Sequence, residues 1–162
     1  MKFNLDKSWL KTLSILTYSN ISEKTLFDKL AEKFCEIDAQ TCVKKARDFG
    51  LINEEKSIIS SLYNYINQKK LSDRAAKRKL ILKGYKTELI DVVFEENFAD
   101  FINEQERIRH IFTKKYAKKY ENCVNSPKDK KKLTINIISY FLRLEFNKDN
   151  IKQVMDIYNE IN

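Results

Sequence analysis

Residues 69–94 read KKLSDRAAKRKLILKGYKTELIDVVF and predict two short helices that meet at a glycine. Ser72 can accept hydrogen bonds from the free amide groups at the start of the first helix, and Gly84 can take the left-handed conformation that ends it. Tyr85 then folds back as an apolar anchor, and Thr87 is expected to cap the second helix. The stretch therefore predicts one unit made of a helix, a glycine turn, an aromatic anchor and a capped helix.

Positive charge is concentrated around this unit. The formal net charge is +8, and residues 67–132 carry 18 Lys or Arg against 10 Asp or Glu, while the flanking segments are nearly neutral. A packed apolar side and a dense cationic side in one small unit indicate a binding surface rather than a catalytic pocket. The partner expected for such a surface is a polyanion or an acidic protein.

The composition favours helices throughout. Among 162 residues there are only two glycines and one proline, too few for the many turns of an all-β fold. The three cysteines have no C-x-x-C spacing, so neither a disulfide framework nor a zinc site is expected. We expect no cofactor and no metal. With no apolar segment of signal-peptide or membrane-spanning length, the sequence predicts a cytoplasmic protein.

The N-terminal third predicts three short helices. Apolar residues at helical spacing, among them Trp9 and Leu10, mark the first helix. Ser22 is expected to cap the second helix and Asp38 the third, which should stop at Gly50. Trp9 is interpreted as the anchor of this group.

The following segments continue the pattern. Asn53 is expected to cap a helix whose inward stripe is Ile58, Ile59, Leu62, Tyr63 and Ile66. A third group begins with Phe98, Phe101 and Ile102 and continues through a helix in which four polar residues fall opposite the apolar stripe: Arg107, His110, Lys114 and Lys118. Ser126 and Pro127 begin the next helix, which breaks near Glu145.

The chain is self-similar. Lys83-Gly84-Tyr85, followed by Ile90 and Val93, matches Leu144-Glu145-Phe146, followed by Ile151 and Val154, at the same spacings. Phe34 occupies a weaker counterpart in the first group. The sequence therefore predicts an all-α fold of three tandem three-helix repeats, at residues 1–52, 53–97 and 98–162. Each repeat needs its neighbour to bury its apolar face, and stacking them predicts an elongated, curved chain.

Several of these stretches resemble the RecX family of bacterial regulatory proteins. LSILTYSNISEKTLFDKLAEK is similar to the first-repeat pattern of the family, FGLIN to its junction into the second repeat, AAKRKLILKGYKTELIDVV to its second-repeat core, and RLEFNKDNIKQVM to its third repeat. The chain departs from the family pattern at Phe34 and Glu145, which replace turn glycines, at Asn53, which replaces an acid, and after Leu16, where arginines are usual.

The resemblance implies a partner and an activity. A RecX-like protein binds the RecA recombinase filament on single-stranded DNA and restrains its ATP hydrolysis, strand exchange and co-protease activity, so that recombination and the SOS response are modulated. The sequence itself has no phosphate-binding glycine loop, nucleophile elbow or metal-ligand cluster, so an enzyme is not expected. We also expect a monomer with no membrane association.

Charge and periodicity supply the candidate binding residues. They are Arg74, Lys77, Arg78, Lys83 and Lys86 in the second repeat and Arg107, Lys114, Lys118, Lys128, Lys131 and Arg143 in the third. Five tyrosines could stack on unpaired bases, but core packing explains most of them better: Tyr63, Tyr65, Tyr85, Tyr116 and Tyr120. His110 has no second histidine or paired cysteine beside it, and no catalytic residue is assigned.

Two other functions fit parts of the sequence. A helix-turn-helix regulator would use residues 72–83 as a reading helix and would prefer one duplex sequence. A helical scaffold for another acidic protein would involve no nucleic acid.

Overall fold

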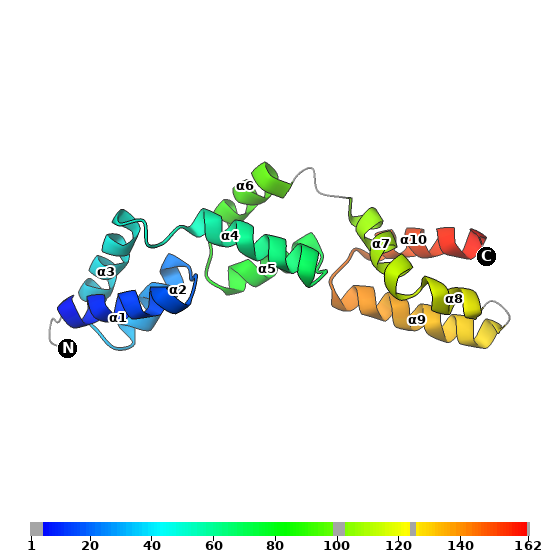
Figure 1. The fold of residues 1–162 in the computed structure, drawn as a ribbon, viewed down its shortest axis with the longest axis horizontal. Helices are drawn as coiled ribbons and strands as arrows, with labels where there is room; N and C mark the ends of the chain where they lie inside the picture. Colours follow the sequence, from blue (N-terminus) through cyan, green and yellow to red (C-terminus); the bar gives the residue numbers. More distant parts are fainter. Residues whose placement is uncertain (1–4, 99–102, 124–125, 162) are drawn as a thin grey trace. The chain divides into compact units, whose positions relative to one another are not determined.

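The computed structural model describes residues 5–98, 103–123 and 126–161, with side chains as far as Tyr158, and every regular element in these ranges is a helix (Figure 1). The all-α class is therefore confirmed. The helices fall into two compact units, Met1–Tyr63 with Lys77–Ala99 and Asn64–Ala76 with Asp100–Asn162. The predicted residues Phe101 and Ile102 lie outside the described ranges.

The first unit contains α1 (Leu5–Tyr18), α2 (Glu23–Ala31), α3 (Glu36–Asp48), α4 (Glu54–Tyr63), the larger part of α5 (Asp73–Leu82) and α6 (Thr87–Phe98). Helices α1 and α2 pack on α3, and α4 packs on α6. The core beneath the first three helices consists of Leu26, Leu30, Ala39, Cys42, Val43, Ala46 and Ile52, with Trp9 packed against it. Trp9 thus anchors this group as predicted.

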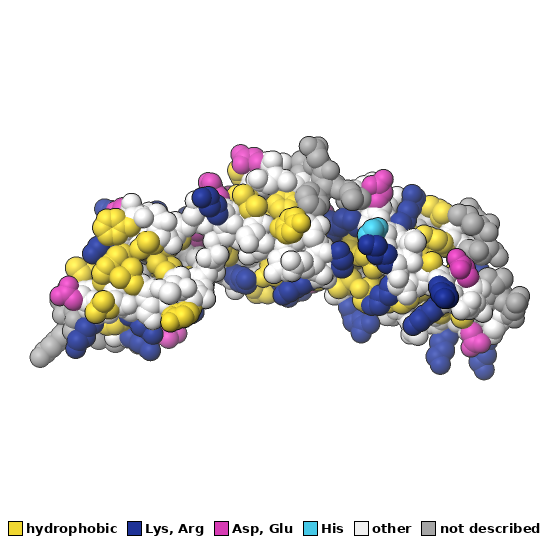
Figure 2. Space-filling view, in the orientation of Figure 1, with side chains coloured by type: hydrophobic (Ala, Val, Ile, Leu, Met, Phe, Trp, Pro, Cys, Tyr) yellow, Lys and Arg dark blue, Asp and Glu magenta, His cyan; other side chains and the backbone are white. Residues whose placement is uncertain are grey.

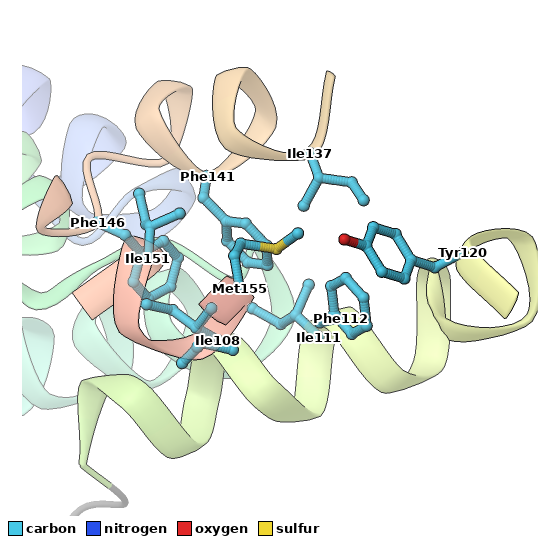
Figure 3. Packing of buried hydrophobic residues seen from close by; sticks show 10 residues of the cluster. Ile108, Ile111, Phe112, Tyr120, Ile137, Phe141, Phe146, Ile151 and Met155 are labelled. Atoms are coloured by element: carbon cyan, nitrogen blue, oxygen red, sulfur yellow. The ribbon is translucent and has the colours of Figure 1, made fainter. Parts of the chain in front are cut away.

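The second unit contains the π-helical turn η1 (Asn64–Gln68), the first turn of α5, α7 (Glu104–Lys115), α8 (Ala117–Asn122), α9 (Pro127–Arg143) and α10 (Lys148–Ile161). Helix α10 packs on α7 and on α9. In its core Phe112, Tyr120 and Ile137 point toward one another from three helices (Figure 3), and the rings of Phe112 and Tyr120 are 5.6 Å apart.

The helix pairs are consistent with a repeated arrangement. In each predicted group of three, the first helix packs on the last: α1 on α3, α4 on α6 and α7 on α10. The repeat boundaries at residues 52/53 and 97/98 stay a prediction, since the two compact units do not follow them.

The self-similar turns have the same backbone geometry. Gly84 has a φ of 83° and Glu145 a φ of 61°, both left-handed. The amide of Tyr85 donates to the carbonyl of Leu80 over 3.2 Å, and the amide of Phe146 donates to the carbonyl of Phe141 over the same distance. Tyr85 and Phe146 are both buried. A glutamate can therefore end α9 in the way that a glycine ends α5, at a conformational cost of about 1–2 kcal/mol.

Three of the predicted helix caps are confirmed. The side chains of Ser22, Asn53 and Ser72 each accept a hydrogen bond, from the amides of Thr25 (3.1 Å), Lys56 (2.9 Å) and Ala75 (3.1 Å) respectively. These bonds satisfy amides that a helix start would leave without a partner.

Two predicted caps are wrong. Helix α3 begins at Glu36 after Cys35, so Asp38 lies buried in its first turn. Helix α6 begins at Thr87 itself, and the amide of Ile90 donates to the carbonyl of Lys86, which therefore holds the capping position. In both cases the helix begins earlier than predicted. The residue at the capping position, Cys35 or Lys86, accepts the first helical hydrogen bond with its backbone carbonyl.

The inward face of α1 differs from the predicted one. Leu10 is 66% exposed, whereas Ser8 and Thr12 are fully buried. Their hydroxyls can be buried because Ser8 donates to the carbonyl of Leu5 and Thr12 to the carbonyl of Ser8. Small hydroxyl residues thus replace leucine where α1 meets its neighbours.

One residue of the predicted inward stripe of α4 faces outward. Tyr63 is 56% exposed, whereas Ile58, Leu62 and Ile66 of the same stripe are buried. The spacing of the stripe therefore continues from α4 into η1, and Tyr63 lies outside it. The helix predicted to carry Arg107, His110, Lys114 and Lys118 breaks at Tyr116, between α7 and α8.

Candidate functional site

Nine of the predicted basic residues have exposed side chains. They are Arg74, Arg78, Lys83, Lys86, Lys114, Lys118, Lys128, Lys131 and Arg143. Lys and Arg side chains are visible on the described surface of both units (Figure 2). Exposed cations of this kind can contact phosphate or carboxylate groups. Lys77, Arg78, Lys83 and Lys86 belong to the first unit, and the other seven predicted residues to the second.

Lys77 is held by its own unit. Its ammonium lies 2.7 Å from a carboxylate oxygen of Asp91 and 4.2 Å from the centre of the Phe94 ring. The side chain is 26% exposed. Lys77 therefore links α5 to α6 and is a poorer candidate for binding than its exposed neighbours Arg78 and Lys86.

Arg107 is the most deeply engaged of the predicted cations. Its guanidinium pairs with Asp73, donates to the carbonyl of Leu71 over 2.7 Å and lies 5.6 Å from the centre of the Phe146 ring. Only 11% of the side chain is exposed. Arg107 therefore holds the start of α5 against α7 and does not lie on an open cationic face.

The end of α9 brings two of the predicted residues together. Arg74, from the first turn of α5, donates to the carbonyl of Glu145 over 3.4 Å. Arg143 is the last residue of α9, two positions earlier in the chain, and is exposed. Arg74 therefore contacts the turn that follows α9, and Arg143 precedes this turn, which also carries the acidic Glu145.

Two lysines that were not predicted to bind a partner lie over tyrosine rings. The ammonium of Lys115 lies 3.7 Å from the centre of the Tyr140 ring, and that of Lys130 lies 5.1 Å from the centre of the Tyr120 ring. Helical periodicity favoured Lys114 over Lys115, because Lys114 lies on the same face of α7 as Arg107 and His110. The partner tyrosines lie too far along the chain for a helical pattern to pair them with these lysines.

Most of the tyrosines belong to the core. Tyr65, Tyr85 and Tyr120 are buried and Tyr116 is half-buried, so packing explains them, as predicted. Tyr63 is the one of the five that presents more than half of its surface to solvent.

A cavity of about 350 Å³ lies in the second unit beside the single histidine. Its lining combines two isoleucines with polar and charged residues: Ile66, Asn67, Lys70, Glu106, Arg107, His110 and Ile111. Figure 2 shows the histidine bordered by Lys or Arg side chains. No sequence pattern pointed to this cavity, because its lining comes from two segments far apart in the sequence, residues 66–70 and 106–111.

Within the described ranges, no three or more His, Cys, Asp or Glu side chains are grouped so that they could bind a metal ion. Among the helices of the same ranges, none has the length and apolar character needed to cross a membrane. The exposed Lys and Arg side chains described above can bind anions.

Comparisons with known proteins agree on one likeness. No protein-family model matches the chain. The regulatory protein RecX of Clostridioides difficile (strain 630) is 25% identical over 146 residues, which cover 90% of this chain and 65% of that protein. The chain thus spans less than two thirds of that relative. In fold, it matches the crystal structure of RecX from Lactobacillus salivarius with a TM-score of 0.72 and 20% identity, over 96% of both chains.

Proposed function

We propose that the chain, which is 25% identical to one RecX protein and shares the fold of another, is a RecX-type regulator that binds the RecA recombinase filament on single-stranded DNA. In this role a monomer inhibits the ATPase, strand-exchange and co-protease activities of RecA. It thereby modulates recombination and the SOS response.

The observation that carries the proposal is the exposure of the predicted cations. A net charge of +8 with nine of the selected side chains open to solvent suits a partner made of phosphates and acidic protein surface. Each phosphate contact releases counterions from the nucleic acid, so the affinity for the filament should fall steeply as salt is raised.

A binding measurement tests the proposal. The protein, labelled with a fluorophore, is titrated with RecA filaments on oligothymidylate, with oligothymidylate alone and with random-sequence duplex. We expect the filament to bind most tightly, with an affinity that declines as the salt concentration rises. Equal affinity for bare DNA and for the filament would contradict recognition of RecA.

A helix-turn-helix regulator receives less support. Reading helices contact base edges with residues near their N-terminus. At the N-terminus of α5, the amide of Ser72 donates to the carbonyl of Leu144 over 3.0 Å, and Arg74 donates to the carbonyl of Glu145. These intramolecular contacts cover the end of α5 that a major groove would need.

A further inference from the structure

The cavity beside His110 has a different character from the exposed cations considered so far. Its floor is aliphatic, since Ile66 of η1 and Ile111 of α7 are 3% and 9% exposed and both line it. Its volume of about 350 Å³ lies at the lower end of the range for small-ligand sites. The cavity is therefore large enough for one bulky side chain and the backbone next to it.

The rim of the cavity carries more cations than acids, with Lys70 and Arg107 against Glu106. Lys70 and His110 are exposed at it, and Arg107 contributes a guanidinium that Asp73 already neutralises in part. Lys114 follows His110 by one helical turn on the same face of α7 and is also exposed. Glu106 is the one acidic residue of the lining.

From this combination we propose that the cavity is a docking site for an acidic peptide segment of a partner protein. A bulky apolar side chain of the segment enters between Ile66 and Ile111, and flanking carboxylates face Lys70 and Lys114. Anchoring by one apolar side chain within a charged rim is how many protein interfaces concentrate their binding energy.

The lining favours a peptide over a nucleic acid. Unpaired bases are generally bound by stacking on the rings of Phe, Tyr or Trp, and none of these residues lines this cavity.

The backbone of Lys70 gives a second observation and a clean variant. Lys70 has a φ of 58° and follows η1, where the amide of Leu71 donates to the carbonyl of Tyr65 over 3.0 Å. Glycine takes this conformation without strain. A lysine there carries a conformational cost while it places its side chain at the rim, and such outliers gather at functional sites.

The test is a titration of the full chain, followed by NMR of the isoleucine methyl groups. The probe is acetyl-Glu-Asp-Phe-Asp-Glu-amide, and the comparison probes are the same peptide with Ser at its centre and pentathymidylate. We expect the Phe peptide alone to shift the methyl signals of Ile66 and Ile111. Lys70→Gly should weaken its binding about three- to tenfold without loss of stability.

Glu145→Gly is the matched control, because Glu145 is also a left-handed residue after a helix but does not line the cavity. It should leave peptide binding unchanged. The proposal is overturned if no probe shifts the two methyl signals, if the Ser peptide binds as tightly as the Phe peptide, if pentathymidylate binds in its place, or if Lys70→Gly binds normally. The titration contains neither RecA nor its filament, so its failure would leave the proposed function untouched.

Discussion

The hydroxyl of Ser22 donates a hydrogen bond of 2.7 Å to the carbonyl oxygen of Lys83, 61 residues later in the chain. A corresponding contact joins Ser72 to Leu144, where the amide of the capping serine donates to the carbonyl over 3.0 Å. Lys83 and Leu144 occupy equivalent places, each just before a left-handed residue. In both cases the start of one capped helix is bound to the turn that ends the corresponding helix of the next predicted repeat. Each contact lies within one compact unit.

Replacement of Gly84 by alanine should destabilise the first unit strongly. Gly84 has a φ of 83°, and a Cβ there would lie 2.8 Å from the hydroxyl oxygen of Ser22 and 3.1 Å from that of Thr25. The strain and the displaced hydrogen bonds together should lower the free energy of unfolding by about 2–4 kcal/mol. Denaturant unfolding followed by circular dichroism measures the change.

Gly50→Ala is the control for this substitution. Gly50 has a φ of 67°, but a Cβ there would meet no atom within 4 Å. Only the backbone strain of about 1–2 kcal/mol should remain. Equal losses for the two variants would show that the contact between Ser22 and the turn contributes nothing.

Ser22→Ala should also destabilise the protein. The fully buried hydroxyl caps α2 and donates to the carbonyl of Lys83, so its removal leaves the amide of Thr25 without its cap and the carbonyl of Lys83 with one donor, the hydroxyl of Thr25, in place of two. We expect a loss of about 1–3 kcal/mol. Ser126→Ala removes a hydroxyl that bonds to the carboxylate of Asp129 and caps no backbone amide, so it should change stability by less than about 0.5 kcal/mol.

The sequence predicted the turns well and the faces of some helices poorly. Gly84, Tyr85 and Ser72 have the predicted roles because each depends on its own φ value or on a neighbour three or four residues away. Local patterns carry this kind of information. They also allowed Glu145 to be matched to Gly84, although a glutamate seldom takes a left-handed φ.

Other features depend on contacts between distant segments. Leu10 faces solvent, and Ser8 is buried with its hydroxyl 3.2 Å from the sulfur of Cys42. The spacing of apolar residues in the sequence does not reveal that a serine faces inward here. The sequence pattern makes Arg107 one member of a cationic stripe. In the structure its side chain is only 11% exposed, because it pairs with Asp73 and donates to the carbonyl of Leu71. Charge and spacing cannot separate a cation that binds a partner from one that holds the fold.

Arg107→Ala should weaken the second unit. It removes the ion pair with Asp73 and the bond to Leu71, and we expect a loss of about 2 kcal/mol in the free energy of unfolding. Arg107→Lys should recover only part of this, because an ammonium cannot reproduce the forked contacts of a guanidinium. Arg109→Ala, at an exposed position of the same helix, should change stability by less than about 0.5 kcal/mol. A loss as large for Arg109 as for Arg107 would contradict this assignment.

Charge reversal of the exposed cations should abolish binding to the filament and leave the fold intact. Arg78, Lys83 and Lys86 are exposed, so their joint replacement by Glu should preserve helical content while it repels phosphate and acidic surface. The control is the joint replacement of three exposed lysines in the segment of α2 and α3 by Glu, which changes the net charge equally: Lys29, Lys33 and Lys44. Filament co-sedimentation compares the two variants. Equal weakening in both would indicate that net charge matters and the location of the cations does not.

The most direct test of the central claim is ATP hydrolysis by RecA on single-stranded DNA, with this protein added at well below one copy per RecA protomer. The account predicts strong inhibition by the unaltered chain and none by the Arg78, Lys83 and Lys86 reversal. Undiminished hydrolysis with the unaltered chain, even at one copy per protomer, would contradict it.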